Sequence, residues 1–298
     1  MKKLGLSLLL ILVICAVAFG ATACNRATTE GQIENVFFNL QNGATESYEY
    51  DVTNSSNSAT GTYKTTIKYY TAGQEVVLSD YNKVTNCGKG YLFTSELTMS
   101  DGYTSKSSCY FVISSVSGVT STFLKPVASF KKVTGSANDF IEYGSYSGKD
   151  YEYTLITSET NTGNVTVGTK FYDNNEFHNS LRGVSKDIFN SGFTLSFNVA
   201  VVTADEQAAA SITAKSDGKE NITTNVLDGD NNKTVYESYA VSLSRSTKVA
   251  GSTQKIWYAK DDVPINAGAE YTFYIRHLIT QIVEGTVTYI LKSFALSL

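Results

Sequence analysis

The sequence has little of the material from which metal sites and acid–base catalysts are built. Its 298 residues include two histidines, one tryptophan, two prolines and four cysteines, and only 17% of them are charged. Zinc sites need three or four nitrogen or sulfur ligands, whereas His178 and His277 are about 100 positions apart with no H-E-x-x-H motif. We interpret both as surface or sheet-face residues. The net charge of −4 also lacks the basic footprint of a nucleic-acid-binding protein. We therefore expect no metal, no other cofactor and no nucleic-acid partner.

Motifs of catalysis are also missing. The nearest approach to a serine-hydrolase motif, Gly144–Gly148 (GSYSG), has tyrosine where the nucleophile belongs. Two S-x-x-K strings, at Ser129–Lys132 and Ser252–Lys255, have no accompanying K-T-G, and there is no glycine-rich nucleotide loop. The sequence predicts a protein that is not an enzyme.

One stretch begins like a calcium-binding loop. Asp228, Asp230 and Asn232 alternate as EF-hand ligands do, but the sixth position is Lys233 instead of glycine and the twelfth is Tyr239 instead of glutamate. The flanking residues are typical of strands. We interpret the stretch as a polar hairpin turn.

The amino terminus is typical of a secretory signal peptide. Lys2 and Lys3 precede an apolar run from Leu4 to Phe19, which is short for a membrane-spanning helix, since such a helix needs about 20 residues. Small residues and Cys24 follow. Residues 1–23 are therefore predicted to be a signal peptide, and their removal takes the net charge from −4 to −6.

Two kinds of processing fit this segment. Ala21-Thr22-Ala23 satisfies the A-x-A rule of ordinary cleavage, which would release a soluble protein with a spare thiol. The string ATAC also resembles the lipobox of bacterial lipoproteins, although Ala21 stands where leucine is usual. Three cysteines would remain after cleavage, an odd number that lipidation of Cys24 explains. We favour an exported lipoprotein, facing outside the cytoplasm and held to the membrane through Cys24, with residues 24–30 as a tether.

Most of the remaining chain alternates between apolar and polar residues. Residues 193–201 (FTLSFNVAV) place a large apolar residue at every odd position, as a strand with one buried face does. Polar turn clusters separate such runs, which indicates an antiparallel sheet. The other alternating runs are Tyr48–Val52, Thr62–Tyr70, Tyr91–Met99, Cys109–Ile113, Tyr151–Ile156, Val165–Tyr172, Val235–Leu243, Tyr271–Ile279 and Val287–Leu291. The predicted fold is mainly β, with a few short helices.

Three short segments have helical spacing. The first holds Ile33, Val36, Phe37 and Leu40, the second holds Phe123, Val127 and Phe130 around Pro126, and the third holds Leu181, Val184 and Ile188. Val36 and Leu40 align with Val184 and Ile188 at an offset of 148 residues. This suggests two tandem strand-rich units, 31–172 and 173–298, each beginning with a short helix.

Cys87 and Cys109 are candidates for a disulfide. A bridge that closes a loop of about 20 residues would contribute roughly 3 kcal/mol of stability. Two buried free thiols are the alternative. A simple hairpin around Asp101 would place Cys109 opposite a residue near Thr94, so the bridge requires another strand arrangement.

With its lipobox, short helix and long strands rich in tyrosine and threonine, the chain resembles envelope lipoproteins of the LolA, LolB and LppX type. The resemblance covers residues 30–298 and implies curved antiparallel sheets that form an incomplete barrel, covered by helices, with acyl chains or lipids in its apolar space. The resemblance assigns no ligand-binding residue to this sequence.

The sequence leaves two functions open. The first is a non-catalytic carrier that holds a lipid or other apolar ligand. The second is an adhesin or surface interaction protein built on a β-sandwich, which would bind glycan or protein through exposed tyrosines. Sheet packing is the other interpretation of those tyrosines: Tyr48, Tyr50, Tyr69, Tyr70, Tyr91, Tyr110, Tyr143, Tyr146, Tyr151 and Tyr153.

Overall fold

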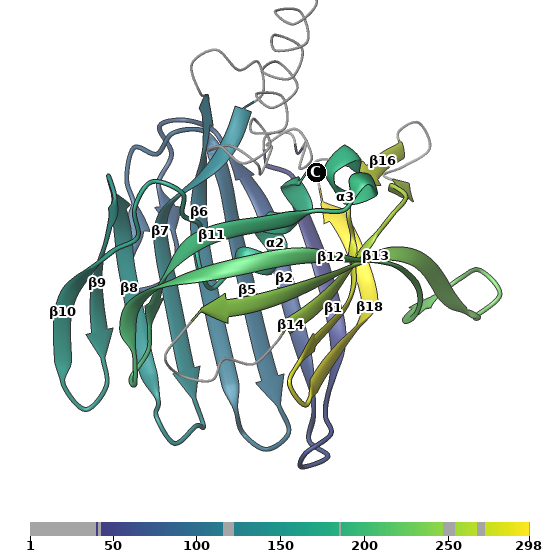
Figure 1. Cartoon of the computed structure of the whole chain (residues 1–298), viewed down its shortest axis with the longest axis horizontal. Coiled ribbons are helices and arrows are strands. Elements are labelled where there is room, and N and C mark those ends of the chain that lie inside the picture. Colours follow the sequence, from purple (N-terminus) through teal and green to yellow (C-terminus); the bar gives the residue numbers. More distant parts are fainter. Residues whose placement is uncertain are drawn as a thin grey trace, which may run out of the picture.

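The protein is built on one antiparallel sheet of 14 strands that curves into a nearly closed barrel (Figure 1). The computed structural model describes residues 40, 43–115, 122–184, 186–246, 254–266 and 272–297. The predicted signal peptide, the tether with Cys24 and most of the first predicted helix lie outside these residues. No helix in the described part of the chain is long and apolar enough to cross a lipid bilayer.

The strands follow one another around the sheet with few crossings. Their order is β10-β9-β8-β7-β6-β5-β2-β1-β18-β17-β14-β13-β12-β11, and two small hairpins, β3-β4 and β15-β16, lie outside it. The bounds are β1 Thr45–Asn54, β2 Thr60–Tyr70, β3 Val76–Val77, β4 Lys83–Val84, β5 Gly90–Met99, β6 Thr104–Ser115, β7 Thr122–Thr134, β8 Phe140–Ser147, β9 Asp150–Ile156, β10 Thr160–Thr166, β11 Thr194–Val202, β12 Gln207–Leu227, β13 Lys233–Ser246, β14 Gln254–Ala259, β15 Val263–Asn266, β16 Thr272–Ile275, β17 Ile279–Glu284 and β18 Val287–Ser297.

Alternation of side chains places one face of each strand inside the barrel. In β1 the even residues Glu46, Tyr48, Tyr50 and Val52 are buried, and the intervening ones are more exposed. Buried residues of most strands of the sheet form the main core inside the barrel, and those of β8, β9 and β10 form a second cluster with β11. The prediction of a mainly β fold of curved antiparallel sheet is confirmed.

The second predicted helix is wrong. Phe123, Val127 and Phe130 belong to strand β7, which pairs with β6 and β8. Pro126 is tolerated because it lies at a bulge, where Phe111 pairs with Pro126 and the preceding Tyr110 pairs with Ala128. The bulge breaks the alternation, so the spacing in sequence resembles that of a helix.

Two predicted strands also have different limits. The run Val165–Tyr172 leaves the ladder early, because β10 ends at Thr166. The run Tyr271–Ile279 is divided between β16 and β17 by a bend in which His277 has a positive φ of 47°. This bend places His277 in the core instead of on a sheet face.

The segment after β10 brings the two sheet edges together. Phe171 forms a parallel bridge with Asn198 of β11, and the backbone nitrogen of Tyr172 donates to the Asn198 carbonyl oxygen over 3.0 Å. On the other side, the backbone nitrogen of Val167 donates to the Lys149 carbonyl oxygen, in the β8–β9 turn, over 2.8 Å. The barrel is thus closed by one connecting segment.

The third predicted helix is divided into three short pieces, because Val184 has an extended backbone with a ψ of 134°. They are α2 (Phe177–Ser180), the 3-10 helix η3 (Leu181–Gly183) and α3 (Lys186–Ser191), after which Gly192 adopts a φ of 73°. Leu181 and Val184 are fully buried in the main core. Figure 1 shows α2 between the wall of β2 and β5 and the wall of β11 and β12, and it shows α3, the last of these pieces, at one end of the barrel near β16. Helices α2 and η3 therefore cover part of the inner face of the sheet.

The strands of the two predicted units occupy separate parts of the sheet. Apart from the two small hairpins, the strands from β1 to β10 form one uninterrupted half of the sheet and those from β11 to β18 form the other, and β1 pairs with β18 between them. Both halves contribute to the main core. The duplication itself stays a prediction.

The disulfide predicted between Cys87 and Cys109 is not formed, and both thiols are free and buried. Cys109 lies in the main core inside the barrel, whereas Cys87 lies in a separate cluster with Leu92 and Tyr110 on the outer face. The sheet itself separates the two sulfur atoms. The strands flanking Asp101 form the simple hairpin that excludes a bridge, with Cys109 opposite Phe93.

Candidate ligand cavity inside the barrel

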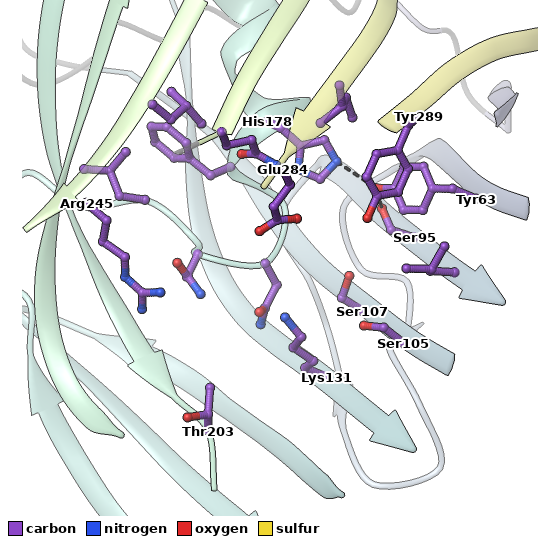
Figure 2. Close-up of a pocket in the computed structure, with 18 of the residues that line it drawn as sticks. Tyr63, Ser95, Ser105, Ser107, Lys131, His178, Thr203, Arg245, Glu284 and Tyr289 are labelled. Carbon is purple, nitrogen blue, oxygen red and sulfur yellow. Dashed lines mark hydrogen bonds between the residues drawn. The ribbon is translucent and has the colours of Figure 1, made fainter. Parts of the chain in front are cut away.

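A cavity of about 320 Å³ lies inside the barrel, between β5, β6 and β7 on one side and β12, β13, β14 and β17 on the other (Figure 2). Ligand pockets typically range from about 300 to 1,000 Å³, so the space suits a small organic molecule. The lining combines aliphatic and tyrosine side chains with hydroxyl, amide and charged groups: Tyr63, Ser95, Leu97, Tyr103, Ser105, Ser107, Lys131, Asn174, Asn175, Phe177, His178, Thr203, Ile212, Leu243, Ser244, Arg245, Gln254, Ile282, Glu284 and Tyr289.

The cavity runs from α2 toward one end of the barrel. Phe177 and His178 of α2 line its inner part. The other part is lined by residues beside turns: Tyr103 precedes β6, Thr203 follows β11, and Glu284 ends β17. Glu284 is exposed, so this end meets solvent.

A buried ion pair holds the helical segment against the sheet. Nη1 of Arg182 lies 2.9 Å from a carboxylate oxygen of Glu46, and both side chains are almost fully buried. Nε and Nη2 of Arg182 donate to the Arg276 carbonyl oxygen, and Tyr48 donates to the Glu46 carboxylate. His277 also contacts this segment, because its Nδ1 lies 2.9 Å from the Arg182 carbonyl oxygen. His277 therefore has a structural role.

A chain of hydrogen bonds runs from the cavity into the core. The Glu176 carboxylate accepts from Ser95 (2.9 Å), and Ser95 accepts from the Tyr63 hydroxyl (2.9 Å). The Tyr63 oxygen is 2.7 Å from Nε2 of His178, which we assign as the donor because the Tyr63 proton is already used. Burial, with a smaller contribution from Lys131, lowers the pKa of His178 to about 4. His178 is therefore neutral at pH 7 and orders the cavity wall without adding charge.

Three carboxyl groups are buried beneath this cavity. Glu176 also accepts from Ser107 (2.7 Å) and Asn179 (2.8 Å). Glu142 accepts from the Tyr151 hydroxyl, and Asp173 accepts from the Tyr146 hydroxyl at 3.0 Å. Each carboxyl therefore has partners, but all of these partners are neutral.

Burial changes the protonation of these carboxyl groups. It raises the pKa of Glu142 to about 8 and that of Glu176 to about 7, and it also raises the pKa of Asp173. Charge repulsion from Asp173 also raises the pKa of Glu142 and that of Glu176. Near neutral pH, Glu142 is therefore largely protonated and Glu176 is close to half-protonated.

Two cationic side chains line the cavity from opposite walls. Arg245 extends from β13 and Lys131 from β7, and Figure 2 shows both directed into the space between the walls. Nε and Nη2 of Arg245 are buried and have no hydrogen-bond partner, which distinguishes them from every other buried side-chain nitrogen in the described ranges.

Other residues singled out from the sequence lie outside the cavity. The Asp228 carboxylate accepts backbone hydrogen bonds from Asp230 and Asn232 and closes the predicted polar turn between β12 and β13. Within the described part of the chain, no group of three or more histidine, cysteine, aspartate or glutamate residues is arranged to hold a metal ion. The ten tyrosines named above are all buried or half-buried, as sheet packing predicts.

The sequence interpretation missed the charged residues inside the barrel. Arg245 continues the inward odd positions Val241 and Leu243 of β13, and Lys131 continues the inward position of Ser129 on β7. Glu142 pairs with Lys131 across the neighbouring strands. A charged residue at an inward position of an alternating strand is the sequence feature that could have identified these residues.

Comparison of the sequence with protein-family models gives no match, and comparison with curated proteins gives none. Among solved structures, the fold is similar to the crystal structure of a β-barrel-like protein of a domain of unknown function, DUF1849, from Brucella abortus. The TM-score is 0.46 and the sequence identity is 9%, over 87% of this chain and 100% of that chain. Values this low carry no inference about ligand or activity.

Proposed function

We propose that the protein is a non-catalytic binding or carrier module that holds a small amphiphilic molecule in the barrel cavity. The observation that carries this proposal is an unfilled space of about 320 Å³ inside the barrel, where a purely structural protein would be close-packed. Leu97, Ile212 and Ile282 offer apolar contact to a ligand, and the hydroxyl groups around them offer hydrogen bonds. An adhesin that uses exposed tyrosines has less support, because the ten tyrosines singled out from the sequence are buried or half-buried, although Tyr81 and Tyr274 are exposed.

Binding of a neutral apolar dye tests this proposal. N-phenyl-1-naphthylamine should fluoresce on binding the wild-type protein and should saturate at one site. Leu97→Trp fills the cavity, so we expect at least a tenfold loss of dye affinity, a difference of about 1.4 kcal/mol. Fluorescence titration measures this change.

Thr98→Trp is the matched control, because Thr98 is the next residue on β5 and is exposed. It places the same indole ring on the outer face and should leave dye binding unchanged. Absence of dye binding to the wild type, or equal binding by both variants, would contradict the proposal.

We also propose that Cys24 carries a lipid that anchors the protein to the bacterial envelope. Two acyl chains suffice for stable attachment, since each buried methylene contributes about 0.8 kcal/mol. Radiolabelled palmitate should label the wild type and Cys15→Ser, whose substituted residue lies within the predicted signal peptide. Cys24→Ala should not be labelled. Label that persists in Cys24→Ala would overturn the anchor.

A further inference from the structure

Two nitrogens of the Arg245 guanidinium have no hydrogen-bond acceptor among the described residues. These atoms, Nε and Nη2, are also removed from solvent. Burying a polar group without a partner is costly, and the cost is greater for a charged one. Arg245 is half-buried as a whole, and the two buried nitrogens of its guanidinium indicate a missing acceptor on that side.

The position of Arg245 shows where such an acceptor would lie. The side chain lines the cavity from β13, and Lys131 lines it from β7 on the opposite wall. In Figure 2 both side chains point into the same space. The Asn175 amide lines this space as well and donates one of its two N–H groups to Ser129, whereas the Ser107 hydroxyl on the same wall donates to Glu176.

The nearby acidic groups do not neutralise Arg245 by contact. Glu206 and Glu284 are near enough to influence its charge, but neither forms a hydrogen bond with its Nε or Nη2. Glu284 is exposed at the end of β17, where water screens its charge. Among the lining residues, two cations face this single carboxylate, and His178 is neutral. Of the buried carboxyl groups beneath the cavity, Glu142 is largely protonated near neutral pH and Glu176 is close to half-protonated. The strongest attraction for a negative group therefore lies at Arg245.

We propose that the ligand is an amphiphilic organic acid, whose oxyanion binds Arg245 with support from Lys131 while its apolar part contacts Leu97, Ile212 and Ile282. The planar guanidinium suits carboxylate and other oxyanions, because its N–H groups can bind two oxygens in parallel. This inference rests on the proposed function and adds the chemical class of the ligand.

Two dyes with the same aromatic skeleton test the inference. N-phenyl-1-naphthylamine is neutral, and 8-anilino-1-naphthalenesulfonate adds a sulfonate. We expect the wild type to bind the sulfonate at least tenfold more tightly, and added salt to weaken this preference. Arg245→Gln should remove about tenfold of the sulfonate affinity and leave the neutral dye unaffected.

Control variants separate charge from folding. Arg245→Lys keeps the cation and should retain more sulfonate affinity than Arg245→Gln. Lys131→Gln should weaken sulfonate binding, whereas Lys132→Gln should not, because Lys132 is exposed on the opposite face of the same strand. Neutral-dye binding by each variant shows that the cavity is still formed.

The outcomes distinguish the two proposals. Equal wild-type affinity for both dyes, or sulfonate affinity unchanged in Arg245→Gln, overturns the acidic ligand and leaves the carrier function standing. Failure of the wild type to bind either dye overturns both. A third outcome also overturns the role of Arg245 in anion binding. In it, Arg245→Gln binds neither dye, whereas Arg245→Lys binds the neutral dye and the sulfonate dye with equal affinity.

Discussion

Arg182→Met is expected to lower the free energy of unfolding by about 3–5 kcal/mol, because it leaves the Glu46 carboxylate buried without its cation. The ion pair joins the helical segment to β1 deep in the barrel, and both side chains are almost fully buried. The substitution also removes the hydrogen bonds to the Arg276 carbonyl oxygen. Urea denaturation followed by circular dichroism would measure the change.

Variants of both partners test whether the pair acts as a unit. Glu46→Leu should also be strongly destabilising, since it leaves Arg182 buried without its anion. The double variant should be less destabilising than the sum of the two single changes, because neither charge remains. Lys83→Met, which removes an exposed ion pair with Glu75, is the control and should change stability little. Additive effects of Arg182→Met and Glu46→Leu would contradict coupling.

The second large effect expected is a loss of stability as the pH rises from about 4.5 to about 8. The pKa values of Glu142 and Glu176 are raised in the folded protein, to about 8 and about 7, mainly by burial. A carboxyl with a raised pKa stabilises the fold at low pH, and this contribution is lost as the pH rises through the folded pKa. At pH 8.5 we expect Glu142→Gln to be more stable than the wild type by on the order of 3 kcal/mol, because the amide cannot ionise.

Denaturation at several pH values would separate this effect from a change of packing. Glu142→Gln and Glu176→Gln should each flatten the fall in stability between pH 5 and pH 8. Glu152→Gln is the control for Glu142→Gln, because Glu152 is exposed on the neighbouring strand. Its pH profile should match that of the wild type. Between about pH 4 and pH 6.5, His178 opposes this fall, because its pKa is lowered to about 4 and its neutral form stabilises the fold increasingly as the pH rises. Wild-type stability that is constant or rises between pH 6.5 and pH 8 would show that Glu142 and Glu176 are not held as the structure indicates.

The alternation of apolar and polar residues predicted the class of fold, because this pattern is visible in short stretches of sequence. The run 193–201 coincides closely with β11, and the runs in β1, β2, β5 and β9 lie within the observed strands. The prediction was wrong where a bulge changed the period, as at Pro126, or where a bend divided a run, as at His277. Such interruptions depend on the pairing of distant strands.

The site was harder to predict because its parts come together only in the closed barrel. Glu176 contacts Ser95 and Ser107, which lie 81 and 69 positions earlier in the sequence. Arg245 and Lys131 come from opposite halves of the sheet. No local motif links such residues, and only the strand order places them around one cavity.

The pairing of β1 with β18 determines where the barrel meets the rest of the chain. Thr45 pairs with Ser297, so the described sheet begins and finishes at one end, and Asn54 pairs with Val287 at the other. Glu284, which lines the cavity, lies beside that second end. A guest therefore reaches the cavity past the turns at this second end of the barrel, where Glu284 meets solvent, and not past the end where Thr45 and Ser297 lie paired.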